Sequence, residues 1–174
     1  MSSPVLMAFL ISAHNPGLVS EWRFHGGHGY AFIDRSVDFD DAADLCDSVS
    51  MDMVTPTSET EFRWLVEAAY NGADNDGALN TWFWIGAYNP EIDSTVTAWQ
   101  GARGWYWAQW EWENGETWNY QDFDGVKESG AWGYDNHGAA IVVTDFTTAE
   151  STRWDSHWRI APANNAYKVV CETR

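Results

Sequence analysis

The sequence predicts a single α+β domain in which two helices pack beside an antiparallel sheet. Two segments near the start carry apolar residues at helical spacing. The rest of the chain alternates short aromatic or aliphatic runs with loops rich in glycine, asparagine and aspartate. A length of 174 residues suits one domain. Helices followed by many short strands are typical of the α+β class.

The first segments predict a strand and then a helix. Phe24–Asp34 is rich in glycine and aromatic residues with partial alternation, which favours a strand. Asp38–Val49 has its apolar residues on one helical face and its acidic residues on the other and in the first turn. This spacing places Cys46 on the buried side of the helix.

The second helix has a clear start signal. Ser58 and Glu61 have the spacing of a capping box, in which each side chain satisfies a free backbone amide of the first turn. An apolar stripe follows, and Asn71-Gly72 is expected to end the helix. Four later runs of strand length are Trp82–Tyr88, Trp105–Trp112, Ala139–Thr144 and Ala166–Cys171.

The segment Asn114–Asn136 is almost devoid of aliphatic residues. Such a stretch inside a compact domain is either disordered or a functional loop held by a ligand or ion. We expect this segment to be irregular. At the other end of the chain, Pro4–Ala13 is apolar like part of a signal peptide but lacks a positive flank. We therefore interpret residues 1–20 as a leader or terminal strand and residues 21–174 as the domain.

The amino-acid composition limits the kinds of molecule that we expect this protein to bind. The chain has 26 acidic and 9 basic side chains, a formal net charge of −17. Because nucleic acid is bound mainly through lysine and arginine contacts to phosphates, we expect no nucleic-acid partner. The sequence has no apolar run of about 18 residues, so we expect no membrane insertion. Thirteen tryptophans indicate a large aromatic core, a ligand-contacting surface, or both.

Cys46 and Cys171 lie 125 positions apart, unlike the close spacing of metal-binding or redox motifs. They are either two separate buried thiols or a disulfide. A bond closing so long a loop would stabilise the fold by about 5 kcal/mol in the chain-entropy account. It would require an oxidising compartment.

The order of these pieces resembles the C-type lectin-like domain family over about residues 21–174. Asp41-Ala42-Ala43 and Cys46 match its first helix, Trp84-Ile85-Gly86 its central strand, and Val169-Val170-Cys171-Glu172 its closing strand. Further matching positions are Trp22, Phe24, Gly29, Tyr30, Phe32, Met53, Val54, Thr55, Ser58, Glu61, Phe62, Trp110, Trp112, Asn114, Gly115, Trp154 and Asp155. The resemblance implies an extracellular domain, secreted or at the cell surface, that acts in recognition or adhesion.

The resemblance also implies disulfides. In that family the helix cysteine bonds to the cysteine of the last strand, here Cys46 and Cys171. The family's second disulfide has no cysteines in this chain: Gly138 occupies one of its positions, and Trp158 or Arg159 the other. The segment Asn114–Asn136, which we call the recognition loop, is therefore expected to be less constrained than in other members.

Sugar-binding members of the family hold a Ca²⁺ ion, which prefers six to eight oxygen ligands. The resemblance places Glu128, Asn136, Asp155 and Ser156 at the metal positions. The match is partial. Asn136 is an amide where the family has an acid, Ser156 replaces an aspartate, and the tripeptide that starts at Glu128 has neither the proline nor the third-position oxygen of the family.

Aromatic rings in or beside the loop suggest a second means of binding. A flat ring can stack on a sugar or anchor a protein partner. The expected ligand-binding residues are Glu128, Trp132, Tyr134, Asn136, Asp155 and Trp158.

Three functions follow from these residues. The first is binding of a glycan or glycoprotein with Ca²⁺ as the bridging ion. The second is calcium-independent binding of a protein receptor, and the third is an acidic, mineral-associated role with diffuse calcium binding. Because no H-E-x-x-H, G-x-S-x-G or phosphate-loop spacing occurs, we do not expect an enzyme.

Overall fold

The computed structural model describes residues 18–70, 82–89, 110–120, 123–127, 138–143 and 157–173. The helices are α2 (Phe39–Asp47) and α3 (Glu59–Ala69). The strands are β1 (Glu21–His25), β2 (His28–Val37), β3 (Asp52–Met53), β4 (Phe83–Asn89), β5 (Glu111–Trp112), β6 (Phe123–Lys127), β7 (Gly138–Val143), β8 (His157–Pro162) and β9 (Tyr167–Glu172). Residues 1–17, which hold most of the expected leader, lie outside this part of the chain.

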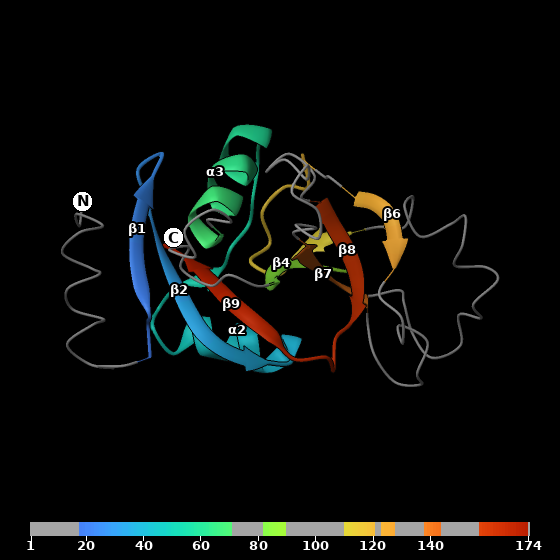
Figure 1. Ribbon diagram of the computed structural model, residues 1–174, viewed down its shortest axis with the longest axis horizontal. Coiled ribbons are helices and arrows are strands. Elements are labelled where there is room, and N and C mark those ends of the chain that lie inside the picture. Colours follow the sequence, from blue (N-terminus) through green and yellow to red (C-terminus); the bar gives the residue numbers. More distant parts are fainter. Residues whose placement is uncertain are drawn as a thin grey trace.

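The described strands form one sheet in the order β1-β2-β9-β4-β7-β8-β6, with β3 paired to β9 and β5 to β4. Figure 1 shows the last strand, β9, running through the middle of the molecule beside β2. The expectation of an antiparallel sheet needs one correction. The pairs β4–β9 and β6–β8 are parallel, so the sheet is mixed.

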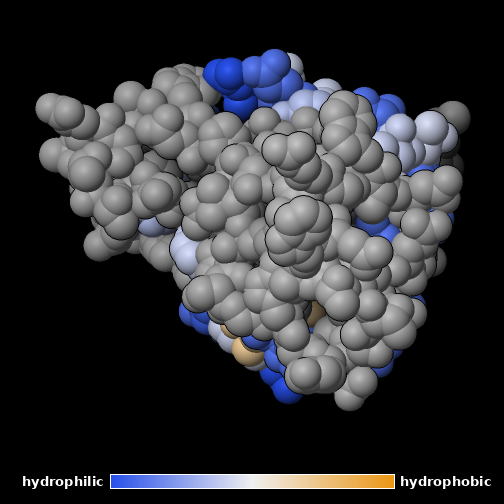
Figure 2. All heavy atoms as spheres, turned by 90° about the vertical axis from the view of Figure 1, so that its right-hand side faces the viewer, coloured by the Kyte–Doolittle hydropathy of each residue, from blue (hydrophilic) through white to orange (hydrophobic). Residues whose placement is uncertain are grey.

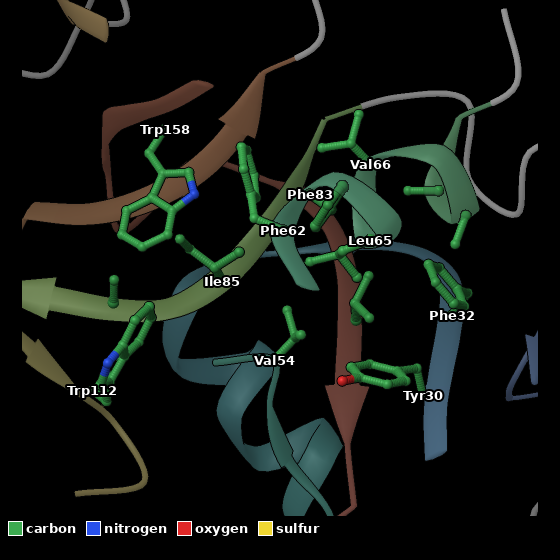
Figure 3. Close-up of a cluster of buried hydrophobic side chains, with 14 of the residues drawn as sticks. Tyr30, Phe32, Val54, Phe62, Leu65, Val66, Phe83, Ile85, Trp112 and Trp158 are labelled. Carbon is green, nitrogen blue, oxygen red and sulfur yellow. The ribbon is translucent and has the colours of Figure 1, made fainter. Parts of the chain in front are cut away.

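The two helices lie on opposite faces of this sheet. Because successive strand residues point to opposite faces, each central strand contributes to two cores. In β2, Tyr30 and Phe32 join the cluster on the α3 side, whereas Ala31 and Ile33 join the cluster on the α2 side. Figure 3 shows the α3-side cluster, in which Phe62 and Leu65 of the helix meet Phe83 and Ile85 of β4.

The first predicted helix is confirmed as α2. The Asp38 side chain caps it by accepting a hydrogen bond from the Asp41 amide, at 2.9 Å. Phe39, Ala42 and Cys46 face the sheet and are buried, as the spacing predicted. The acidic residues lie on the exposed face.

The second predicted helix is confirmed as α3, with one difference at its cap. The Ser58 hydroxyl accepts from the Glu61 amide as expected, at 3.2 Å. The Glu61 carboxylate accepts from the Thr57 amide and hydroxyl, at 2.9 and 3.0 Å. Its other oxygen accepts from the Tyr30 hydroxyl, so Glu61 ties the helix start to β2 as well as capping it.

Cys46 and Cys171 form a disulfide, with their Cα atoms 5.5 Å apart. This settles the alternative left open by the cysteine count. Both residues are fully buried, and the bond joins α2 to β9. The first helix of the described residues is therefore covalently attached to the last strand.

The β1–β2 hairpin closes through Gly26 and Gly27, whose φ angles are +60° and +97°. Two consecutive positive φ angles are needed in the tightest hairpin turns, and glycine adopts them without steric cost. The turn places His25 opposite His28 at the end of the hairpin.

The strands that surround the recognition loop correct two expectations. Part of that loop is regular, because β6 lies within it and pairs with β8, whose backbone would otherwise be an open edge. The register of β7 and β8 also differs. Gly138 pairs with Pro162 and Trp158 with Val142, so Gly138 does not face Trp158 or Arg159 as the resemblance implied. A long connection between these strands leaves their register to side-chain packing rather than to a tight turn.

We predict that replacing both cysteines with alanine destabilises the domain by roughly 3 to 5 kcal/mol, because the unfolded chain loses a restraint across 125 positions. Urea unfolding of the variant and of the wild type, each with and without reductant, measures this difference. Reductant should lower the wild-type midpoint and leave the variant unchanged. Equal midpoints for the oxidised wild type and the variant would contradict the prediction.

Candidate functional site

Most of the predicted ligand residues fall outside the described part of the chain. They are Glu128, Trp132, Tyr134, Asn136, Asp155 and Ser156. Their assignment to a calcium and sugar site stays a prediction. The structure does describe strands β6, β7 and β8, which border these segments, and residues 113–120, with which the recognition loop begins.

Trp158 is the one predicted ligand residue that the structure describes, and that prediction is wrong. Its side chain is fully buried, with ring contacts to Phe62, Trp112 and Tyr120. Figure 3 shows its indole directed into the core from β8. A ring with no exposed surface cannot stack on a ligand, so Trp158 belongs to the scaffold beneath the loop.

The described strands set a distance requirement on the predicted calcium site. Lys127, which precedes Glu128, pairs with Ile160, three residues and about 10 Å along β8 from His157. Gly138 and His157 stand at opposite ends of the β7–β8 pair, about 17 Å apart. Ligands of one Ca²⁺ ion lie within about 5 Å of each other. The predicted site therefore requires the segments that leave these ends to turn toward one another.

The stem of the recognition loop, residues 113–120, is attached to the core by aromatic rings. Trp118 lies 4.6 Å from Trp112 and 5.9 Å from Trp158 between ring centroids. Tyr120 lies 5.5 Å from Trp158 and 6.3 Å from Phe62. These edge-on and tilted packings fix where the loop leaves the domain.

Polar contacts hold the beginning of the same stem. Asn114 donates from Nδ2 to the Thr55 hydroxyl, at 3.1 Å, and its Oδ1 accepts from the Glu116 amide, at 3.0 Å. Gly115 has a φ of +76°, which a side chain would disfavour. Asn114 thus joins the stem to the connector that leads from β3 into α3.

An acid-lined cavity of about 360 Å³ lies beside this stem. Glu172 of β9 faces it and is only 8% exposed. Glu172 accepts from the Thr55 amide at 3.2 Å and contacts Nδ1 of His28 at 2.8 Å. The Tyr30 hydroxyl lies 2.8 Å from Glu61 and 3.4 Å from Glu172, so it donates mainly to Glu61. The lining residues are His25, Gly26, His28, Tyr30, Thr55, Thr57, Ser58, Thr60, Glu61, Glu116 and Glu172.

Two groups in this cavity favour their protonated forms. Burial, together with the negative charges of Glu61 and Glu116, raises the pKa of Glu172 to about 8, although the Thr55 amide opposes this effect. Burial and the carboxylates of Glu172 and Glu61 also raise the pKa of Tyr30. Near neutral pH the cavity therefore keeps a proton on Glu172 that an exposed glutamate would release.

The described residues include neither a cluster of metal-binding side chains nor a membrane-spanning helix. No three of their histidine, cysteine, aspartate or glutamate side chains are arranged to hold a metal ion. Neither helix in this part of the chain combines the length and the apolar character needed to cross a membrane. The described surface visible in Figure 2 is mostly hydrophilic, which agrees with the acidic composition.

Solved structures with a similar fold identify the architecture. The carbohydrate-recognition domain of the mouse scavenger receptor C-type lectin is 17% identical, with a TM-score of 0.58 over 92% of this chain and 96% of that one. Human lithostathine is 18% identical, with a TM-score of 0.61 over 92% and 98%. A calcium-independent type II antifreeze protein is 12% identical, with a TM-score of 0.59 over 91% and 92%. The chain has the C-type lectin-like fold. No protein-family model and no curated protein sequence matches the chain.

Sequence reasoning missed two features of this lectin-like domain. The acid-lined cavity was missed because Glu61 was assigned only to a cap and Glu172 only to a family motif. A signal was present, since Glu172 shares its strand face with buried Val170 and is therefore a charge at an inward position. The anchoring of the stem by Trp118 and Tyr120 had no comparable signal, because no periodicity marks them.

We predict that Glu172→Gln makes the domain less sensitive to alkaline pH. In the folded protein Glu172 holds its proton up to about pH 8, against 4.5 for an ordinary glutamate. The folded state thus binds more protons between these values, and the contribution of Glu172 to stability falls as pH rises through that window. At about pH 9 the variant should exceed the wild type in free energy of unfolding by on the order of 2 kcal/mol.

Urea unfolding at about pH 5, 7 and 9 measures this effect as the difference in free energy of unfolding between the variant and the wild type. Glu59→Gln is a matched control, because Glu59 is exposed on the same helix as Glu61 and forms its ion pair with Arg63, away from the cavity lining. The difference should grow with pH for Glu172→Gln and stay constant for the control. A difference for Glu172→Gln that is constant with pH would show that Glu172 titrates normally.

Proposed function

We propose that this domain is an extracellular recognition module that binds a carbohydrate ligand through the recognition loop and the segment before β8, with Ca²⁺ as the bridging ion. The observation that supports it most is the attachment of an acidic segment to a rigid lectin-like scaffold. Residues 121–156 contain seven acidic and two basic side chains. The stem that leads into them is packed against buried tryptophans.

The proposed chemistry depends on oxygen donors. Glu128, Asn136, Asp155 and Ser156 would supply carboxylate, amide and hydroxyl oxygens of the kind that Ca²⁺ prefers. Neighbouring hydroxyls of a sugar would complete the coordination of the ion. Trp132 and Tyr134 would stack on the apolar face of the sugar ring.

Two further observations support an extracellular recognition role. The Cys46–Cys171 disulfide is typical of proteins that fold in an oxidising compartment. The scavenger receptor domain with the same fold is described as a carbohydrate-recognition domain. On those grounds we propose that this protein is secreted or displayed at the cell surface, acts in adhesion and binds a sugar.

A second function, calcium-independent binding of a protein receptor, is favoured by a specific departure in the loop. Ser129 and Gly130 follow Glu128 where sugar-binding members have a proline and a side-chain oxygen. The fold also occurs in an antifreeze protein described as calcium-independent. In this alternative Trp132 and Tyr134 anchor the partner, and the acidic residues steer a basic surface toward the loop.

Calcium binding predicts a stability gain that a chelator removes. Ca²⁺ at 100 times its dissociation constant should add about 2.7 kcal/mol to the free energy of unfolding. Changing Glu128 and Asp155 together to alanine should abolish this gain. The control variant changes Asp40 and Asp44, two exposed acids of α2, to alanine and removes the same charge elsewhere.

A glycan array with and without Ca²⁺ separates the two functions. We expect binding that requires Ca²⁺ and is lost in the Glu128 and Asp155 double variant but kept in the control. Glycan binding that persists with chelator would contradict the bridging ion. An array without binding, together with no stability gain from Ca²⁺, would overturn the carbohydrate function and favour the protein receptor.

A further inference from the structure

Three carboxylates from three separate parts of the fold face the cavity beside the loop stem. Glu61 comes from α3, Glu116 from the stem and Glu172 from β9. The titratable residues in the lining are His25, His28, Tyr30, Glu61, Glu116 and Glu172. The lining contains no lysine or arginine, and a histidine is cationic only when protonated. No permanent positive charge within the lining therefore offsets the carboxylates.

The hydrogen bonds around Glu172 are compatible with a proton on its carboxyl group. Tyr30 has a single hydroxyl proton, which it donates to Glu61 at 2.8 Å. Glu172 keeps its contact with His28 in either protonation state, because an imidazole nitrogen either accepts from a carboxylic acid or donates to a carboxylate. Loss of the Glu172 proton thus breaks no bond to His28. It adds a negative charge that faces Glu61 and Glu116.

The parts that carry these carboxylates differ in how firmly they are held. Strand β9 lies between β2 and β4, and α3 buries Phe62, Leu65 and Val66 in the core. The first residues of the stem belong to no helix or strand. One contact to the rest of the fold runs from the Asn114 side chain to Thr55, the residue whose amide bonds to Glu172, and another from the Glu113 amide to the Gly86 carbonyl. Repulsion within the cavity is therefore relieved most easily by movement of the stem.

We infer that the proton on Glu172 holds the first part of the stem, residues 114–117, against Thr55, and that its loss releases Glu116 and these residues outward, up to the packed ring of Trp118. This inference rests on the proposed function in one respect: if the loop binds the ligand, alkaline solution weakens binding. Release of these stem residues moves the beginning of the recognition loop. The proposed ligand residues themselves stay chemically unchanged. The domain would then bind well when the cavity is protonated and poorly when it is fully ionised.

The raised pKa of Glu172, about 8, supports a change in mildly alkaline solution. An exposed glutamate would already be ionised well below neutral pH.

Amide hydrogen exchange in the stem tests, without any ligand, whether the proton on Glu172 holds the stem in place. Amides of residues 114–117, followed by mass spectrometry at about pH 6 and 9 and corrected for intrinsic rates, should lose at least tenfold protection in the wild type at the higher pH. Glu172→Gln should keep its protection, because glutamine cannot ionise but can still accept from the Thr55 amide. Glu59→Gln should behave like the wild type.

A second variant allows the inference to be tested even if Glu172→Gln does not fold. Glu116 is exposed and its carboxylate can be removed by Glu116→Gln with little effect on the fold. This variant should also reduce the loss of protection. Equal loss in the wild type, Glu172→Gln and Glu116→Gln, or no loss in the wild type, would overturn the inference.

Ligand binding then tests the functional consequence. A glycan identified on the array, measured in excess Ca²⁺, should bind the wild type about tenfold more weakly at pH 9 than at pH 6 and bind Glu172→Gln equally at both. A stem that responds to pH while binding does not would overturn the link to recognition. Absence of any glycan binding would refute the proposed function, while the exchange measurement would still decide whether the proton controls the stem.

Discussion

The position of strand β9 between β2 and β4 is the constraint on which the rest of the structure depends. Val169 and Cys171 on one face of this strand pack toward α2, and Val170 on the other face packs toward α3. The disulfide makes the first connection covalent. The last residues of the chain therefore join both helices and both halves of the sheet, and the scaffold that carries the recognition loop is complete only when they are in place.

Much of this architecture could be predicted from the sequence. The apolar spacing around Cys46 gave the face of α2, and Ser58 and Glu61 marked the start of α3. The mixed sheet could not be predicted, since a short apolar run such as that around Ile85 pairs in either direction. The register of β7 and β8 could not be predicted for a related reason. The 13 residues between Val143 and His157 do not specify a turn, so local sequence leaves the pairing open.

The candidate site was less predictable than the fold. Trp158 resembled an exposed ring because it neighbours Asp155 in a polar segment, yet the position of β8 beside β6 and β7 turns it into the core. Glu61 and Glu172 are 111 positions apart in sequence. The pairing of β9 with β2 brings Glu172 to Tyr30, and the packing of α3 against the sheet brings Glu61 there. Contacts of this kind depend on tertiary structure, which no local pattern encodes.

Native-state hydrogen exchange of the β9 backbone tests the central role of this strand most directly. The amides of Val169, Val170 and Cys171 should exchange only through global unfolding, with the same free energy as that measured by denaturant. Phe32 of β2 should match them, because it pairs with Val170. Exchange of the β9 amides through a lower-energy local opening, while β4 stays protected, would contradict the account.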